Sequence, residues 1–423
     1  MKVLVVGGGA REHALCLALS RDPAVSSLLC APGNAGIADI ATVLPIAVGD
    51  PSAVAELAAD AGVDLVVIGP EVPLVAGAAD AVRATGIACF GPSAGAARIE
   101  GSKSFAKEVM AAAGVPTAAS RVCTDLDEVA VALDEFGPPY VVKDDGLAAG
   151  KGVVVTTDQA VALTHAASCQ RVVVEEFLDG PELSLFAITD GSTALPLAPA
   201  QDFKRLGDGD TGPNTGGMGA YSPLPWAPKE LVDEVVADVV MPTVAELRRR
   251  GTPFSGLLYA GLALTANGVR VVEFNARFGD PETQVVLARL RTPLAGLLRS
   301  AATGTLGDHP PLDWDEVAAV TVVMAAAGYP ANPRAGDPVS GVGAANQIEG
   351  VQVFHAGTAR DAAGRLVTAG GRVVSVTGVG QDVAQARERA YTAVDLIDFP
   401  GAHYRRDIAA AAVIQPGRGR EDR

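Results

Sequence analysis

The sequence predicts a mixed α/β and α+β protein of several domains. Short apolar runs alternate with helical patterns up to about residue 98. Strand-rich segments with glycine-rich loops fill the middle, and Val/Ala-rich strands with a late helix follow residue 317. With 423 residues, the chain also exceeds the usual size of a single hydrophobic core.

The first domain is expected over residues 1–98. Apolar strands at 2–6, 64–68 and 87–90 alternate with helical segments such as 12–19. Continuous apolar runs are typical of strands that are buried on both faces, as in parallel sheets. Alternation with helices indicates crossover connections. We therefore predict a Rossmann-like, doubly wound parallel sheet.

The rest of the chain is expected to form three further parts and a tail. Residues 100–113 have a helical pattern that Gly114 and Pro116 end. Further strands are expected at 140–143, 153–156 and 171–175, helices at 158–167, 229–249 and 382–397, and a glycine-rich loop at 207–219. The expected parts are 99–185, 186–316 and 317–415, with a charged, disordered tail at 416–423.

The composition argues against several classes of function. The net charge is −16, from 33 lysines and arginines against 49 aspartates and glutamates, which disfavours nucleic acids and anionic membranes as partners. Five cysteines without a CxxC pair indicate reduced, mostly buried thiols, and the five histidines lack zinc-ligand spacing. There is no signal-peptide pattern and no apolar run of about 18 residues. We expect a cytoplasmic monomer that acts on small molecules.

The triplet Gly7-Gly8-Gly9 joins the first strand to its helix and offers a phosphate site. Amides at a helix N-terminus favour anions such as a sugar phosphate. The pattern approaches the dinucleotide fingerprint, but Glu12 stands where the third glycine belongs. A dinucleotide site and a plain structural turn stay as alternatives. A second tight turn at 32–36 also follows a strand, at the sheet edge where such folds bind ligands.

A serine hydrolase is the competing interpretation from another class. Residues 91–95, Gly-Pro-Ser-Ala-Gly, match the GxSxG pattern between a strand and a helix, with aspartates and histidines downstream of Ser93. Against this, Pro92 fixes a backbone angle just before the serine, and no partner residues stand out. An ordinary strand-to-helix turn is the simpler interpretation.

Residues 146–152, Gly-Leu-Ala-Ala-Gly-Lys-Gly, form a lysine-bearing glycine loop between two expected strands. It is not a P-loop, because the spacing before Gly-Lys is one residue short and Gly152 replaces the hydroxyl that would hold Mg²⁺. Such a loop can cover phosphates as a flap, with Lys151 on their oxygens. A plain hairpin turn is the alternative. Lys143 lies in the preceding apolar strand, where a lysine is costly unless an anion pairs with it.

The most informative stretch begins at Val271 as a strand and ends at Thr283 as a polar turn. Side chains of a strand point to opposite faces in turn. The two expected faces are Glu273, Asn275 and Arg277 on one side and Val272, Phe274 and Ala276 on the other. A carboxylate and an amide oxygen beside a guanidinium suit Mg²⁺ and phosphate chemistry.

Two other segments carry weaker signals. Residues 171–178 form a strand that ends in Glu175 and Glu176, whose side chains point apart and so do not make a catalytic pair. Residues 210–219, Asp-Thr-Gly-Pro-Asn-Thr-Gly-Gly-Met-Gly, are a loop too specific for a generic linker. Loops held on a scaffold often carry substrate contacts.

Taken together, these segments resemble the phosphoribosylamine–glycine ligase (glycinamide ribonucleotide synthetase) family of the ATP-grasp superfamily. The most specific segments are RFGDPETQ at 277–284 and DTGPNTGGMG at 210–219. The others are VVGGGAREHAL at 5–15, APGNAG at 31–36, GPEVPLV at 69–75, FGPSAGAARIEGSKSFAK at 90–107, KDDGLAAGKG at 143–152, EEFLDGPE at 175–182 and FHAGT at 354–358. They run in one order from the N-terminus well into the last part of the chain.

The resemblance implies a Rossmann-like domain, a two-part ATP-grasp module and a small mixed C-terminal domain, with nucleotide between two sheets. The implied reaction uses ATP to join glycine to 5-phosphoribosylamine through glycyl phosphate, the second step of purine synthesis. The implied metal is Mg²⁺ or Mn²⁺. Little covalent chemistry falls to such a protein, whose work is positioning and charge neutralisation.

The resemblance also implies roles for individual residues. The implied nucleotide site is Lys103, Lys143, Gly146, Gly150, Lys151, Gly152, Glu175, Glu176, Phe177, Leu178 and Glu182. The implied metal ligands are Glu273 and Asn275. The implied catalytic residues around glycine and the acyl phosphate are Arg277, Asp280, Asp210 and Asn214. The implied substrate contacts are Thr215, Gly216 and Gly217, with Gly9, Arg11 and Asn34 at the phosphoribosyl group.

The chain departs from the family pattern at several positions. Asp144 stands where alanine is expected, and Phe203 replaces an expected histidine. Residues 153–179 contain no glycine, so closure over ATP is expected to depend on the 146–152 flap. Residues 257–265 contain no carboxylate, which leaves the number of metal ions open. Another ATP-grasp carboxylate–amine ligase and a non-catalytic nucleotide-binding protein are therefore the alternatives.

Overall fold

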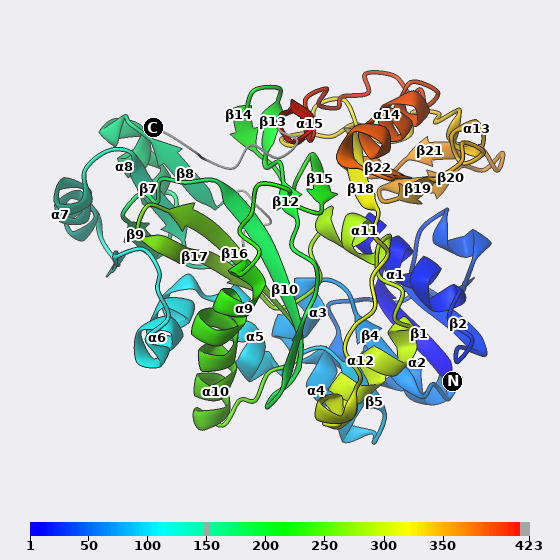
Figure 1. Cartoon of the computed structure of the whole chain (residues 1–423), viewed down its shortest axis with the longest axis horizontal. Helices are drawn as coiled ribbons and strands as arrows, with labels where there is room; N and C mark the ends of the chain where they lie inside the picture. Colours follow the sequence, from blue (N-terminus) through cyan, green and yellow to red (C-terminus); the bar gives the residue numbers. More distant parts are fainter. Residues whose placement is uncertain (148–151, 415–423) are drawn as a thin grey trace.

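The computed structural model describes residues 1–147 and 152–414. In this part of the chain, the strands form four sheets of four or five strands and two short ribbons (Figure 1). The expected tail at 416–423, together with Gly150 and Lys151, lies outside the described residues. No helix within the described ranges has both the length and the apolar character needed to cross a lipid bilayer.

The N-terminal sheet is fully parallel, as predicted from its apolar strands. In sheet order the strands are β3 (Thr42–Val43), β2 (Ser27–Pro32), β1 (Lys2–Gly7), β4 (Leu65–Ile68) and β5 (Ala88–Phe90). The connecting helices are α1 (Ala10–Ser20), η1 (Ile37–Asp39), α2 (Pro51–Ala61), α3 (Glu71–Ala76) and α4 (Ala78–Ala84). The four residues Val3 to Val6 are fully buried, because helices cover both faces of this sheet.

A small antiparallel sheet, here called the lid, follows the first domain. In sheet order its strands are β6 (Ser120–Cys123), β9 (Val172–Glu175), β7 (Tyr140–Asp144) and β8 (Val153–Thr156). Helices α7 (Leu126–Phe136) and α8 (Gln159–Ala167) pack on it around a core that includes Leu133, Val142 and Val174. Figure 1 shows the lid at the upper left, facing the central sheet.

The central sheet carries the stretch that was most informative in the sequence. Its antiparallel strands are, in order, β11 (Ala194–Pro196), β10 (Glu182–Asp190), β16 (Ser255–Thr265) and β17 (Gly268–Asn275). Helix α12 (Leu294–Thr303) packs against β10 and β16 and also contacts β5 of the first domain. The central sheet is thereby attached to the parallel sheet.

One prediction about β17 is wrong because the strand contains a bulge. Gly261 pairs with Glu273 and Leu262 with Val271, so Val272 has no partner in the register. Val271 and Phe274 are buried in the core, whereas Val272 is only half-buried and lies outside the core, although Val272 and Phe274 both line the cavity. An extra residue changes the alternation of side chains, so Val272 does not share the face of Phe274. The strand also ends at Asn275, and Arg277 therefore lies beyond it.

The fourth sheet combines two segments that lie far apart in the chain. Its antiparallel strands are, in order, β12 (Gln201–Asp202), β15 (Gly219–Ser222), β18 (Ala318–Ala325), β22 (Arg372–Gly380) and β19 (Val351–His355). Helix α14 (Val383–Val394) covers β18 and β22. The expected boundary between 316 and 317 therefore falls between strands of one continuous sheet.

Two long helices expected from the sequence are interrupted. The 100–113 pattern is divided at Ser102 into α5 (Ala94–Gly101) and α6 (Lys103–Ala113), because the Ser102 side chain caps α6 by accepting from the Phe105 amide. The 229–249 pattern contains a π-helical turn, η2 (Val236–Val240), between α9 (Leu231–Val235) and α10 (Met241–Arg249).

The remaining elements are short. The 207–219 loop includes a ribbon of β13 (Arg205–Gly207) and β14 (Thr211–Asn214). The others are α11 (Glu282–Leu287), η3 (Leu306–Asp308), α13 (Val342–Ala345), β20 (Thr358–Arg360), β21 (Leu366–Thr368) and α15 (Ala410–Ile414). Four of the five cysteines are buried and all five are free.

A buried histidine pair joins the parallel sheet to the C-terminal strands. The main-chain N–H of His355 donates to Nδ1 of His13 at 2.8 Å. The Asn34 amide bridges the two parts, because its Nδ2 donates to the carbonyls of Gly8 at 2.9 Å and His355 at 2.7 Å. A Cβ at Gly36 would lie 2.4 Å from the His355 ring, so this close approach requires glycine.

We expect this interface to make the protein sensitive to acid. Burial lowers the pKa of His13 from 6.5 to about 3 and that of His355 to about 4. Below pH 6.5 the unfolded chain therefore binds more protons than the folded one, and the free energy of unfolding falls as the pH drops. Urea titrations at pH 7 and pH 5 should show a loss of about 2 kcal/mol per histidine.

The variant His13→Asn keeps an acceptor for the His355 amide but cannot titrate. It should lose less stability between pH 7 and pH 5 than the natural chain does. His309→Asn is the matched control, because the His309 ring bonds only to the adjacent Pro310 carbonyl among the described residues. An unchanged pH dependence in His13→Asn would contradict this account.

Candidate active site

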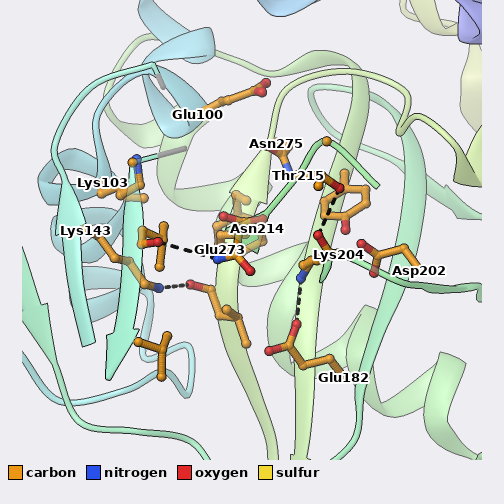
Figure 2. Close-up of a pocket in the computed structure, with 18 of the residues that line it drawn as sticks. Glu100, Lys103, Lys143, Glu182, Asp202, Lys204, Asn214, Thr215, Glu273 and Asn275 are labelled. Carbon is orange, nitrogen blue, oxygen red and sulfur yellow. Dashed lines mark hydrogen bonds and ion pairs between the residues drawn. The ribbon is translucent and has the colours of Figure 1, made fainter. Parts of the chain in front are cut away.

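A cavity of about 760 Å³ lies between the lid and the central sheet. The predicted site residues that line it are Arg11, Lys103, Lys143, Gly146, Gly152, Glu175, Glu176, Phe177, Leu178, Glu182, Asp210, Asn214, Thr215, Gly216, Glu273, Asn275, Arg277 and Asp280. Gly9, Asn34 and Gly217 do not line it. Figure 2 shows Glu273 between two lysines on one side and Lys204 on the other.

The buried lysine that the sequence singled out is paired with an acid of the same sheet. Nζ of Lys143 on β7 lies 2.8 Å from Oε2 of Glu175 on β9, and it donates to the Val272 carbonyl at 2.8 Å. Lys107 of α6, which sequence reasoning missed, lies 3.1 Å from the other Glu175 oxygen. Burial lowers the pKa of Lys107 to about 8, against the pull of Glu175. The anion that Lys143 requires is therefore Glu175.

The flap begins at residues tied to the start of α6. Asp145 accepts from the amide of Ser104 at 2.7 Å and from its hydroxyl at 2.7 Å. Lys103, the first residue of α6, donates to the Gly146 carbonyl at 3.0 Å. Burial lowers the pKa of Lys103, whereas the nearby Glu273 opposes this. Lys103 thus contacts the first residue of the flap and lines the cavity.

Glu273 and Asn275 lie on the cavity side of β17, opposite Gly261 and Tyr259. A Cβ at position 261 would lie 3.2 Å from the Glu273 side chain, so glycine leaves it room. Within 1–147 and 152–414, neither side chain has a hydrogen-bond or ion-pair partner, and no cluster of three His, Cys, Asp or Glu is arranged for a metal. Two free oxygen donors fit a Mg²⁺ ion that completes its shell with phosphate and water.

At the opposite end of the cavity, Glu182 forms an ion pair that the sequence analysis did not anticipate. Lys204 lies 2.6 Å from Glu182. Burial alone would lower the pKa of Lys204, but the Asp202 and Glu182 carboxylates raise it above its usual range. Phe203, which lies between Asp202 and Lys204 in the sequence, packs against Arg405. The guanidinium carbon of Arg405 lies 4.9 Å from the centre of the Phe203 ring. Position 203 is therefore a packing position in this chain.

The strand 172–175 continues into a segment that presents main chain to the cavity. Glu176 donates its amide to the Ala119 carbonyl at 3.0 Å, and its carboxylate accepts from the Ala119 amide at 2.9 Å. In the part of the chain that the structure describes, the main-chain groups of Phe177 and Leu178 have no such partner. An adenine edge can be read by free main-chain groups of this kind.

Ion pairs join the residues that follow β17 to other domains. Arg277 lies 2.9 Å from Glu100 of α5 and 3.3 Å from Glu71 of α3. Asp280 lies 3.0 Å from Arg372 of β22. No pattern in the sequence indicated ion-pair partners for Glu71, Glu100 or Arg372, although Glu71 and Glu100 fall inside motif segments.

The 210–217 loop is held by the same C-terminal part of the chain. Arg372 donates to the Gly216 carbonyl at 2.6 Å, and Arg405 lies 2.7 Å from Asp210. Asn214 reaches the Val153 carbonyl of the lid at 3.5 Å. Thr215 donates to the Lys204 carbonyl at 2.9 Å. The loop thus connects the lid, the cavity wall and the C-terminal sheet.

The first-domain residues have mainly internal partners. Glu12 stands at the position where the dinucleotide fingerprint has its third glycine. Its carboxylate accepts from the Gly9 amide at 2.6 Å and pairs with Arg11 at 2.6 Å. Asn34 is occupied by the contacts described above. Ser93, the candidate nucleophile, caps α5 by accepting from the Ala96 amide at 3.2 Å. The last contact supports the ordinary turn over the hydrolase.

A lid sheet and a central sheet that enclose a lysine-lined cavity define the ATP-grasp class of proteins. Family models of phosphoribosylglycinamide synthetase match the chain in three parts, the N domain at 1–100, the ATP-grasp domain at 101–283 and the C domain at 319–411. The chain belongs to the phosphoribosylglycinamide synthetase family.

Relatives and solved structures agree with this assignment. Phosphoribosylamine–glycine ligase of Streptomyces coelicolor is 66% identical over 97% of this chain and 99% of its own length. The enzyme of that name from Mycobacterium leprae is 58% identical over 97% and 98%. The crystal structure of the Thermotoga maritima enzyme is 33% identical, with a TM-score of 0.84, and covers 97% of this chain and 100% of its own.

A more distant solved structure shares the fold alone. The biotin carboxylase domain of Hydrogenobacter thermophilus 2-oxoglutarate carboxylase is 16% identical, with a TM-score of 0.69. It covers 95% of this chain and 91% of its own.

The Lys107–Glu175–Lys143 cluster should be important for the stability of the lid. In Glu175→Gln, two buried lysines lose their counter-ion, and removing one partner of a buried pair costs about 3–5 kcal/mol. Hydrogen exchange should show faster opening of the β7 and β9 amides. Glu135→Gln is the control, since Glu135 forms an exposed lid pair with Arg121. Equal exchange in both variants would contradict the cluster's role.

Proposed function

We propose that this chain uses ATP to join glycine to 5-phosphoribosylamine, giving N1-(5-phosphoribosyl)glycinamide, ADP and phosphate in de novo purine synthesis. Membership of the family and the names of its close relatives support this reaction. Within the chain, the observation that carries the proposal is the pair of unpartnered oxygen donors on β17, Glu273 and Asn275, which share one cavity with Lys103 and Lys143.

The phosphate end of ATP is assigned to the lid side of the cavity. Lys103 and Lys143 neutralise the phosphate oxygens, and the 146–152 flap, with Gly146, Gly150, Lys151 and Gly152, covers them. Glu273 and Asn275 would hold Mg²⁺ or Mn²⁺, which when bound would supply positive charge that offsets the charge of the phosphate groups. The glycine carboxylate then attacks the γ-phosphorus, ADP leaves, and glycyl phosphate is formed.

The adenosine end is assigned to the segment after β9. The main chain of Phe177 and Leu178 reads the adenine edge, and Glu182 binds the ribose hydroxyls. Lys204, at 2.6 Å from Glu182, keeps that carboxylate ionised and oriented. Because Glu175 pairs with both Lys143 and Lys107 and offsets one of their two positive charges, its role is to set the charge of the phosphate end.

The second step is assigned to the region beyond β17. The ribosylamine nitrogen attacks the carbonyl carbon of glycyl phosphate, phosphate leaves, and the amine proton passes to solvent or to the departing phosphate. Arg277 and Asp280 flank the acyl phosphate, with Asp210 and the loop residues Asn214, Thr215, Gly216 and Gly217 around it. Of the three predicted phosphoribosyl contacts in the first domain, Arg11 lines the cavity. Gly9 and Asn34 stay predictions for the phosphoribosyl site.

Phosphate release from ATP tests the proposed reaction against its alternatives. The purified chain is assayed with Mg²⁺, glycine and freshly generated phosphoribosylamine, and each component is then omitted in turn. Turnover should require all of them. Release that does not depend on glycine or on the amine would reject the ligase, and another amino acid in place of glycine would point to a different ATP-grasp ligase. No ATP-dependent release under any condition would favour a binding protein.

We predict that Glu273→Gln abolishes Mg²⁺-dependent turnover. The amide keeps the shape of the side chain but removes the charge that a hard cation requires. Turnover should fall by at least about 100-fold, since second-shell changes at metal sites alone cost about 10- to 100-fold. The urea midpoint should be unchanged, because the Glu273 side chain forms no hydrogen bond or ion pair within the described residues. Glu108→Gln, an exposed acid on α6, serves as control; normal turnover in Glu273→Gln would place the metal elsewhere.

A further inference from the structure

The segment Gly69–Pro70–Glu71 has no role in the functional assignment above, yet it lies where a ligand is expected. It follows β4, and Glu71 is the first residue of α3. Ligands of doubly wound folds bind beyond the carboxyl ends of parallel strands. Pro70, Glu71 and the more distant Glu100 all line the cavity.

Two glutamates from separate segments pair here with the guanidinium of Arg277. Nη2 of Arg277 lies 2.9 Å from Oε1 of Glu100, and its Nε lies 3.3 Å from Oε2 of Glu71. The second Glu100 oxygen accepts from the Ala276 amide at 2.7 Å. Among the described residues, the second Glu71 oxygen, Oε1, has no side-chain partner. The Glu71 side chain is 23% exposed and that of Glu100 only 7%.

The charges around Arg277 do not balance. Arg11 is the other cation that acts on Glu71 and Glu100, but it lies 2.6 Å from Glu12. Three carboxylates therefore surround two guanidiniums in a buried setting. Burial raises the pKa of Glu100, with Arg277 opposing it. An uncompensated buried charge is unfavourable, so this end of the cavity attracts a further cation.

Four other carboxylates of the cavity already have cations at close range, whereas Glu273 and Glu282 form no ion pair among the described residues. Glu175 has Lys143 and Lys107, Glu182 has Lys204, Asp280 has Arg372, and Asp210 has Arg405. Figure 2 shows Glu100 at the end of the cavity away from Glu182, on the side of Asn275. The place with excess negative charge is thus next to the end of β17.

We infer that Glu71 and Glu100, held by Arg277, form the binding site for the ammonium group of glycine. This inference rests on the proposed function. The glycine carboxylate has to meet the γ-phosphate beside Asn275, and the ammonium group is only one carbon away from that carboxylate. Ala276, whose amide binds Glu100, directly follows Asn275. Glycine, as one small zwitterion, therefore reaches both the γ-phosphate beside Asn275 and the pair of Glu71 and Glu100. A carboxylic acid substrate without an ammonium group would leave the charges of Glu71 and Glu100 uncompensated.

The complete reaction with Glu71→Gln and Glu100→Gln tests the inference. Each variant loses a charged hydrogen bond to the ammonium group, and the KM for glycine should rise about 10- to 100-fold. The KM values for ATP and phosphoribosylamine should stay within about twofold of those of the natural chain. Glu71→Asp, which keeps the charge, should restore part of the affinity for glycine.

The control is Glu246→Gln. Glu246 also pairs with two arginines, Arg249 and Arg250, and its side chain is 5% exposed, but it does not line the cavity. Its KM values should be those of the natural chain. Urea midpoints of all variants show whether folding is retained.

The outcomes separate this inference from the proposed function. A natural chain without glycine-dependent turnover rejects the proposed function itself. An active natural chain with an unchanged KM for glycine in both variants overturns the ammonium site. A rise confined to phosphoribosylamine assigns the acids to the other amine and overturns the glycine site. Equal rises in the KM values for all three substrates, together with a lowered urea midpoint, would show that the ion pair is only structural. That result would also overturn the glycine site.

Discussion

The ion pair between Lys143 and Glu175 is the central member of a set of charge pairs in the cavity walls, and the arrangement of the domains depends on these pairs. Most of the balancing partners come from different segments. Lys107 reaches Glu175 from α6, Arg277 reaches Glu71 and Glu100 of the first domain, and Arg372 reaches Asp280 from the C-terminal sheet. The same contacts that stabilise the cavity therefore fix the relative positions of the domains.

This arrangement also explains how a strongly acidic protein provides a site for polyphosphate. The net charge of −16 repels anions at a distance, but salt screens that field within about 10 Å. Inside the cavity, Lys103, Lys107 and Lys143 act at short range and in partial burial, where charges interact more strongly than in water. Local lysines thus outweigh the global charge at the phosphate end of the cavity.

The sequence was sufficient for features that depend on local pattern. Continuous apolar runs predicted the parallel sheet, and the spacing of Glu273 and Asn275 predicted their common side of β17. Features that depend on a partner far along the chain were missed. The bulge at Val272 is set by the pairing with β16. The interruption at Ser102 was also missed, although it is set by a local side-chain cap. Glu71 and Arg277 are separated by 206 residues, so their contact has no local signature.

The bulge has a consequence for sequence variation within this fold. Lys143 of the lid is bonded to the main-chain carbonyl of residue 272, not to its side chain. Exchanging the valine for another residue leaves that acceptor in place, whereas deleting one residue from β17 would remove it and invert the strand beyond. Position 272 should therefore tolerate substitution but not a change in length. The position of the lid relative to the central sheet is therefore set by a main-chain contact of β17, the bond from Lys143 to the carbonyl of residue 272.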